Sequence, residues 1–350
     1  MKKLIIVLAV LSVTLAGCKD TGRTLPSATG TIYEMLVVVD KPLWEGSTGD
    51  TIRHYLAADM PCMPQMEPYF NISHVSPQLF DDLFKPTRNI LYIDINPERY
   101  TQNKVVYSTN IYSQPQAVCR LQIANAEELP AFLGKYGENI RQWFVRQELD
   151  RQQYFYRSFT NKEAREAVQK RFTVDMLVPS DYMLVRDTTF VLQNRPIKLV
   201  WCVNDGGSMR KDLLVWAYPY TDNNTFTEPY LLAMRDSIMR HTVSGAIEGS
   251  YCGTEYKQIP PQFNEISVQK NAYAAEIRGL WKMFNGTSMG GPFVQHTRLD
   301  EINQQVVTAE VFLFAPGQKK RNALRQQEAI LYSLILQQEI NELKEINVTE

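Results

Sequence analysis

The residues whose types and spacing come nearest to a catalytic motif are Gly286, Ser288 and Gly290, in the run Gly286-Thr287-Ser288-Met289-Gly290. The pattern Gly-x-Ser-x-Gly can present a serine hydroxyl on a sharp strand-to-helix turn, where it attacks acyl groups. Such a serine requires a histidine to accept its proton and a carboxylate to orient that histidine. The motif therefore has to be judged by its partners.

Those partners are missing from the expected places. Residues 286–292 look like the serine segment of subtilisin-type proteases, but none of the four histidines is followed by Gly-Thr. An α/β-hydrolase would need its acid before its histidine, whereas Asp300 follows His296. The stretch is therefore interpreted as a glycine-rich turn. A periplasmic serine hydrolase that uses Ser288 is the alternative.

Motifs for metals and cofactors are also missing. The chain has no His-Glu-x-x-His, no Cys-x-x-Cys and no Gly-x-x-x-x-Gly-Lys, so we expect neither a metal nor a cofactor. The pairing of the four cysteines after Cys18 is open, because four cysteines allow three pairings. Cys119 and Cys202 lie in apolar runs, which favours buried free thiols. These four cysteines are Cys62, Cys119, Cys202 and Cys252.

A binding site is predicted around Arg278 and Trp281, which come at the end of an expected strand. An arginine beside a tryptophan can hold a carboxylate or a sugar by bidentate hydrogen bonds and stacking. A buried tryptophan with the arginine packed over it is the competing interpretation. In the binding hypothesis the contact surface also includes Met289, Gly290, Gly291 and Phe293. No complete catalytic set accompanies these residues, so the sequence favours a non-enzymatic binding or assembly protein.

The first eighteen residues have the pattern of a lipoprotein signal peptide. Lys2 and Lys3 precede an apolar run too short to span a membrane, and Leu15-Ala16-Gly17-Cys18 follows. We expect cleavage after residue 17 and lipid, including palmitate, on Cys18. Several acyl chains anchor a protein stably where one does not. Residues 18–30 are rich in glycine and threonine and are predicted to be a flexible tether.

Lys19 stands where an aspartate would retain a lipoprotein in the inner membrane, so we expect the outer membrane and its periplasmic side. Cleavage leaves 35 basic residues (two of the 37 being Lys2 and Lys3) against 38 acidic ones. A balance of −3 argues against nucleic acid as a partner. The membrane, reached through the lipid, and an envelope protein or glycan are the expected partners.

The expected elements fit an α+β fold, with antiparallel sheets flanked by helices. Each half of the chain contains strands followed by a helix. The two halves could therefore be related α/β sandwich domains. We place domains at residues 31–159 and 160–350. Expected strands cover 35–39, 89–95, 105–112, 116–123, 173–178, 182–192, 197–204, 212–219, 264–269, 272–280 and 305–314. Expected helices cover 48–58, 76–84, 126–157 (interrupted near Pro130 and Gly134–Gly137), 160–171, 228–241 and 319–345.

Several dispersed segments together resemble one family, the Bacteroidota lipoproteins grouped as domain of unknown function 4837. The resemblance implies an envelope lipoprotein without an assigned activity, and it transfers no catalytic residue. In that family the glycine-rich box is Met-Gly-Gly-Pro-Phe rather than Gly-Thr-Ser-Met. The segments are Lys41-x-x-Trp44-Glu45-Gly46 with Gly49-Asp50, Pro64-Gln65-x-Glu67-Pro68, Arg88-Asn89-Ile90, Arg278-Gly279-Leu280-Trp281, Met289-Gly290-Gly291-Pro292-Phe293, and Ala315-Pro316 with Lys320-Arg321.

The resemblance also implies O-glycosylation at Asp followed by Ser or Thr. Asp50-Thr51-Ile52, Asp187-Thr188-Thr189 and Asp236-Ser237-Ile238 match this short pattern. Thr188, which we expect in a turn, is the leading candidate.

Overall fold

The structure, a computed structural model, describes residues 24–342. The signal peptide and Cys18 lie outside the described residues. The chain divides into two compact units. The smaller contains residues 24–31, Met35–Lys41 and Ser73–Ala126; the larger contains Ile32–Glu34, Pro42–Ile72 and the chain from Glu127 on.

A five-stranded sheet runs through the smaller unit. Its order is β2 (Asn71–Val75), β1 (Glu34–Val38), β3 (Asn89–Ile95), β5 (Ala117–Ile123) and β4 (Lys104–Thr109). β1, β3 and β5 are parallel, and β4 is antiparallel to β5. Leu36, Val38, Ile90 and Val118 pack together on this sheet. Ser27 and Thr29 form β-bridges with Gln114 and Thr87, so the segment predicted as a tether joins this unit from Ser27 on.

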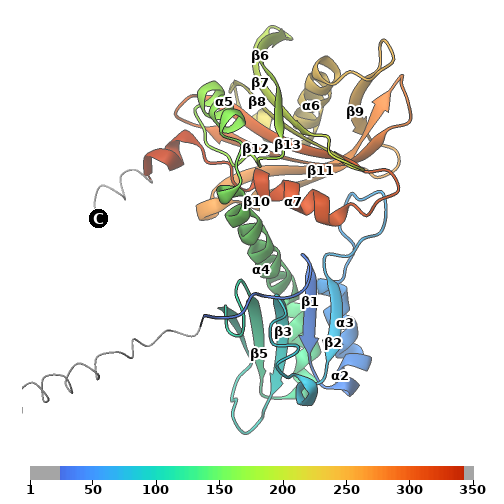
Figure 1. Ribbon diagram of the computed structural model, residues 1–350, viewed down its shortest axis with the longest axis vertical. Coiled ribbons are helices and arrows are strands. Elements are labelled where there is room, and N and C mark those ends of the chain that lie inside the picture. The colour runs from blue at the N-terminus through green and yellow to red at the C-terminus, as the bar shows by residue number, and fades with distance from the viewer. Residues whose placement is uncertain (1–23, 343–350) are drawn as a thin grey trace, which may run out of the picture. The chain divides into compact units, whose positions relative to one another are not determined.

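The larger unit is built on an eight-stranded antiparallel sheet (Figure 1). Its order is β10 (Gln262–Ser267), β11 (Tyr273–Phe284), β12 (Gly290–Asp300), β13 (Gln305–Phe314), β8 (Arg210–Pro219), β7 (Arg195–Asn204) and β6 (Met183–Leu192), and β9 (Tyr251–Glu255) pairs with β11. The α+β class is confirmed. The two sheets differ in strand number and direction.

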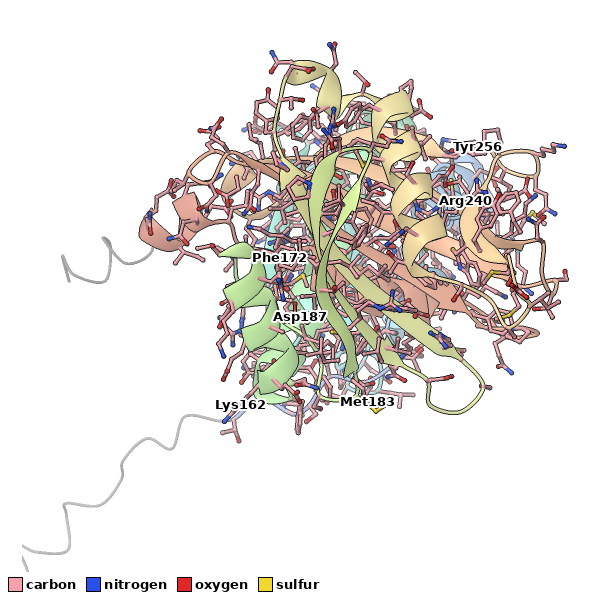
Figure 2. The ribbon with its side chains drawn as sticks, turned by 90° about the horizontal axis from the view of Figure 1, so that it is seen from above. Lys162, Phe172, Met183, Asp187, Arg240 and Tyr256 are labelled. Carbon is pink, nitrogen blue, oxygen red and sulfur yellow. The ribbon has the colours of Figure 1, made fainter. Side chains whose placement is uncertain are left out.

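Helices cover both faces of this larger sheet. α5 (Lys162–Phe172) and α7 (Arg321–Leu331) pack on one face and α6 (Glu228–Thr242) on the other. The other helices are α2 (Lys41–Glu45), α3 (Ser47–Leu56) and α4 (Leu129–Ser158), and α3 packs on α4. Single 3-10 turns lie at Pro77–Leu79, Ala126–Glu128, Asn223–Phe226 and Gln269–Asn271. Figure 2 shows α5, from Lys162 to Phe172, beside β6 at Asp187, to which Arg171 donates a hydrogen bond.

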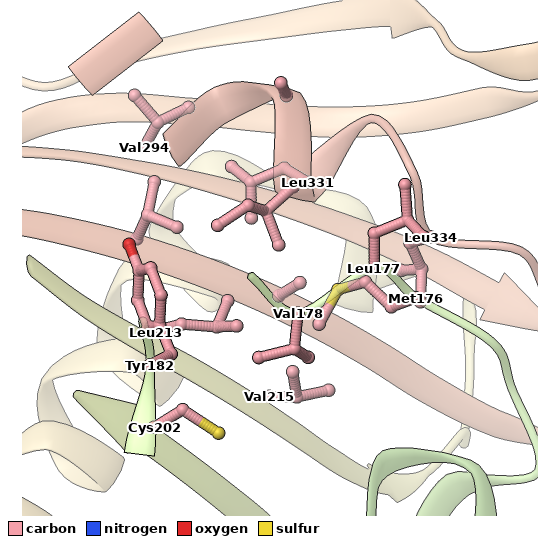
Figure 3. Packing of buried hydrophobic residues seen from close by; sticks show 14 of the residues in the cluster. Met176, Leu177, Val178, Tyr182, Cys202, Leu213, Val215, Val294, Leu331 and Leu334 are labelled. Atoms are coloured by element: carbon pink, nitrogen blue, oxygen red, sulfur yellow. The ribbon is translucent and has the colours of Figure 1, made fainter. Parts of the chain in front are cut away.

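Alternate side chains of β8 point to opposite faces of the sheet and therefore belong to two different cores of this unit. Leu213 and Val215 face α5 and α7, and Figure 3 shows them with Val294, Leu331 and other apolar side chains of that layer. Leu214 and Trp216 face α6 in the second core. Charged groups placed between sheet and helix on either face are therefore removed from water.

Three expected elements are corrected. The helix predicted over 76–84 is only a 3-10 turn at Pro77–Leu79, and the strand predicted over 173–178 is a single bridge between Asp175 and Ile335. The same bridge interrupts the helix predicted over 319–345, because Ile335 must be extended to pair, and the chain is helical again over residues 337–342.

The predicted interruption of the long helix is also wrong, since α4 continues through Gly134 and Gly137. A Cβ at Gly137 would lie 2.4 Å from the ring of Tyr55. This glycine therefore allows α3 to pack closely on α4 rather than breaking the helix.

All four described cysteines are free and buried, as the apolar surroundings of Cys119 and Cys202 indicated. Burial raises the pKa of the Cys202 thiol to about 12, which keeps it protonated. Across residues 24–342, no helix combines the length and the apolarity needed to cross a bilayer.

Candidate functional site

A buried cluster of charges lies between β11 and α7. Arg278 of β11 donates two hydrogen bonds to Glu276, from Nε and Nη2 at 2.8 and 2.9 Å. It donates two more to Glu328 of α7, from Nη1 and Nη2 at 2.9 and 2.8 Å. The guanidinium fork matches two carboxylates at once, which only arginine can do. The cluster thus ties the helix to the sheet.

A second arginine extends the cluster from α7. Arg325 Nη1 donates to Glu328 Oε2 at 2.6 Å. His296 of β12 adds a ring nitrogen 3.3 Å from Glu276 Oε2. Arg325, Glu328 and Tyr332 are spaced by three and four residues, so they share one side of the helical segment.

The start of α7 is fixed by Glu67. Its carboxylate accepts the backbone N–H groups of Lys320 at 2.7 Å and Arg321 at 3.0 Å. Arg321 Nη1 also donates to the carbonyl of Pro68 at 2.9 Å. An acidic group here satisfies free N–H groups and opposes the positive end of the helix dipole. Two of the segments that carry the family resemblance, Pro64–Pro68 and Lys320–Arg321, meet at this contact.

An open cavity of about 850 Å³ lies over the cluster. Glu276, Arg278 and Arg325 form part of its wall, and Tyr69 and Tyr332 form another. Polar and apolar residues of α4, among them Gln142 and Val145, and of the segment from Gln262 to Gln269 line the rest of it. The volume falls in the range of small-molecule pockets, about 300–1,000 Å³, although such pockets are usually more apolar.

Arginines stack on the tyrosines of this wall. The guanidinium of Arg325 lies 5.0 Å from the ring centre of Tyr69, and that of Arg141 lies 4.3 Å from the same ring. Arg146 lies 5.8 Å from the ring of Tyr332. These cation–π contacts hold the guanidinium groups in place without using their N–H donors.

The carboxylates of the cluster remain ionised. Burial alone would raise the pKa of Glu276, but Arg278 and His296 outweigh it and hold the pKa well below its usual range. For Glu328, burial is likewise outweighed by Arg278 and Arg325, which lower its pKa. Burial raises the pKa of the Tyr332 hydroxyl.

These groups can bind a ligand but are poorly placed to transfer protons. General acid–base catalysis needs a group that titrates near the working pH, and both carboxylates stay charged there. Among the described residues, no three His, Cys, Asp or Glu side chains gather as a metal site requires. The cluster and the cavity wall provide a ligand with hydrogen-bond donors, aromatic faces and charges held in fixed positions.

The structure separates the binding candidates that the sequence placed together. Arg278 faces α7 and the cavity. Trp281 is 3 % exposed in the core under α6, where its Nε1 donates to the carbonyl of Leu313 at 3.1 Å. Phe293 is 1 % exposed in the same core. Positions 278 and 281 differ by an odd number, so they lie on opposite faces of the strand.

The same core under α6 also determines the residues at positions 289 to 291. Met289 is partly buried against it. A Cβ at Gly290 would lie 2.6 Å from the carbonyl oxygen of Trp281, and one at Gly291 would lie 2.0 Å from that of Leu313. The strands approach too closely for any other residue. The six candidates therefore do not form one exposed surface.

Ser288 lies exposed in the loop between β11 and β12. The histidines of this unit are occupied elsewhere: His296 beside Glu276, His241 stacked on Phe190, and His54 against Tyr55. The loop joins two antiparallel strands, not a strand and a helix as the nucleophile motif requires. Within residues 24–342, no hydrogen bond joins Ser288 to a histidine.

Thr188 lies in the middle of β6 and not in the predicted turn. Its backbone pairs with Leu199, its side chain is half-buried, and neighbouring Asp187 is bound by Arg171. The glycosylation pattern at Thr188 therefore lies on an edge strand of the sheet.

The sequence analysis missed Glu67, Arg325, Glu328 and Tyr332. One signal was present: the three charged residues of α7, Arg321, Arg325 and Glu328, are spaced by four and three and so lie on one side of the helix. Such charges are expected in water, yet Arg325 and Glu328 are buried. The partner of Glu328 in β11 is Arg278, fifty residues away in the chain, and no local pattern reveals that pairing.

Two family models match segments of this chain. A family model described as a domain of unknown function, DUF4837, matches residues 161–333. Residues 161–333 belong to DUF4837. A second domain of unknown function, DUF8532, matches residues 28–157. Neither a curated protein nor a solved structure matches the chain.

The DUF4837 domain supplies Glu276, Arg278 and Arg325 to the cavity, and the DUF8532 match supplies Tyr69 and Arg141. Both sets lie in the larger unit. The cavity thus draws its wall from both matched segments.

The cluster predicts loss of stability in acid. Because the pKa of Glu276 is lowered on folding, the unfolded chain takes up a proton first as the pH falls below about 4.5. The free energy of unfolding should then fall by about 1.4 kcal/mol for each pH unit over which only the unfolded chain is protonated. Urea denaturation of Glu276→Gln between pH 7 and pH 3 should show a shallower slope than the parent. Glu301→Gln, at an exposed position, is the control. Equal slopes for Glu276→Gln and the parent would contradict the assignment.

Proposed function

We propose that this chain is a lipid-anchored, non-enzymatic binding protein of the outer membrane, on its periplasmic side. It holds a polar ligand from the envelope, a glycan or part of a protein, in the cavity over Arg278. The observation that carries the proposal is that cavity, about 850 Å³ in volume and walled by arginines and tyrosines. The pattern ending at Cys18 supports the anchor.

The charges under the cavity favour binding over catalysis. Glu276 and Glu328 are ionised and engaged by Arg278, so neither is available as a proton donor. Preformed sites bind well because little ordering is needed when the ligand arrives. The four hydrogen bonds of Arg278 provide that rigidity.

The test compares the full-length protein with a variant whose cavity is filled. Both are extracted from the membrane fraction with mild detergent, and native mass spectrometry measures bound mass. Val145 lies in the wall of the cavity, so Val145→Trp should remove a ligand mass that the parent protein carries. Val191→Trp, at an exposed position of β6, is the matched control and should keep it.

The same bound masses in Val145→Trp and the parent, with equal melting temperatures, would contradict a ligand in this cavity. Recovery of the protein in the soluble fraction would contradict the anchor.

A further inference from the structure

Arg325 is buried with most of its donors unused. Its side chain is 4 % exposed, and among the described residues only Nη1 has an acceptor, namely Glu328. Nε is buried without a partner. Unsatisfied donors on a buried charge are costly, so a structure seldom retains them without a use.

The nearby carboxylates in the described part of the chain do not accept hydrogen bonds from the unused donors of Arg325. Glu276 and Glu328 already accept four hydrogen bonds from Arg278. On α4, Glu138 is engaged by Arg141 and Asp150 by Arg146. Arg325 thus has an ion-pair partner in Glu328 but keeps unused N–H donors at the cavity wall.

The tyrosines fix the direction of the Arg325 guanidinium. Tyr69 and Tyr33 lie 5.0 and 5.7 Å from its centre. A planar guanidinium held between two rings keeps one orientation, and its Nη2, which is neither buried nor engaged by a described residue, is the donor available to an oxyanion.

We propose that the cavity receives the anionic group of its ligand, a carboxylate or a phosphate, and that Arg325 binds it. This inference rests on the proposed binding function and names the chemistry of that same site. Arg141 and Arg146, on the facing helix α4, line the same cavity, but each is paired with an acid, Glu138 and Asp150, so the proposal rests on the unused donors of Arg325.

The experiment follows the arginine Nε–H signals of the full-length protein in detergent by ¹⁵N NMR. Methyl phosphate and acetate are titrated separately at constant ionic strength, with methyl glucoside as a neutral probe. Arg325→Lys keeps the charge beside Glu328 and removes the fork. We expect one of the anions to shift the Arg325 signal saturably, and Arg325→Lys to weaken its binding by about ten-fold or more. The tighter of the two anions identifies the source as phosphate or carboxylate.

Three results would overturn the inference. Saturable binding of the glucoside, with neither anion bound, would leave the cavity as a binding site but make its ligand neutral. Equal, non-saturating shifts of all arginine signals would show that the anions only screen charge and do not bind at one site. Unchanged anion affinity in Arg325→Lys, with the same melting temperature, would assign the anion to another residue. A ligand mass found in the parent but not in Val145→Trp would uphold the proposed function in each case.

Discussion

Replacing Arg235 by methionine is expected to lower the free energy of unfolding by about 3–5 kcal/mol, because it leaves a buried carboxylate without its partner. Arg235 of α6 donates from Nε and Nη2 to Glu310 of β13 at 2.8 and 2.7 Å. Neither side chain is exposed. The guanidinium also lies 3.6 Å from the ring centre of Phe293. Urea denaturation of the full-length chain measures the loss.

The double variant Arg235→Met with Glu310→Leu is the control for this prediction. Apolar residues of similar size often replace a buried ion pair without loss. We therefore expect the double variant to recover most of the lost stability. A loss under about 1 kcal/mol in Arg235→Met alone would mean that water reaches Glu310.

Trp281→Ala is expected to cost about 3–5 kcal/mol of unfolding free energy, since it empties a large space in the core under α6. The indole packs 5.2 Å from the ring of Phe312 and donates to the carbonyl of Leu313. Losing the indole also leaves that carbonyl without this donor. Thermal and urea denaturation would show the change.

The Trp281→Ala variant distinguishes a tryptophan that packs in the core from one that contacts the ligand. Tyr154→Ala, at a highly exposed position of α4, should change stability by no more than about 0.5 kcal/mol. If Trp281→Ala kept full stability and lost the ligand mass, the tryptophan would be a contact residue, as the sequence analysis proposed. We expect lost stability instead.

Local patterns predicted much of the fold. The strands at Asn89–Ile95 and Gln305–Phe314 have the predicted bounds, because continuous apolar runs bounded by polar residues are strong signals for buried strands. β12 went unrecognised for the opposite reason. It begins with Gly290, Gly291 and Pro292, which are typical of turns, and continues with buried polar residues such as Gln295 and His296.

The candidate site was predicted only in part. Arg278 was identified, because an arginine in a strand that is otherwise apolar stands out. Its supposed partner Trp281 belongs to the other face of the sheet. The true partners are Glu276, two residues away, and Glu328, fifty residues away.

The sequence by itself determined the α+β class, the main strands and helices and the likeness to DUF4837, because these depend on neighbouring residues and short motifs. The tertiary structure alone decided the cavity and its charges. Arg325, Glu328 and Tyr69 become neighbours of Arg278 only after α7 and the loop before β2 pack near β11. Burial places these charged residues, of types that are usually exposed, in one ionised cluster. Removing water strengthens each charge–charge interaction and makes each unpaired hydrogen-bond donor energetically costly.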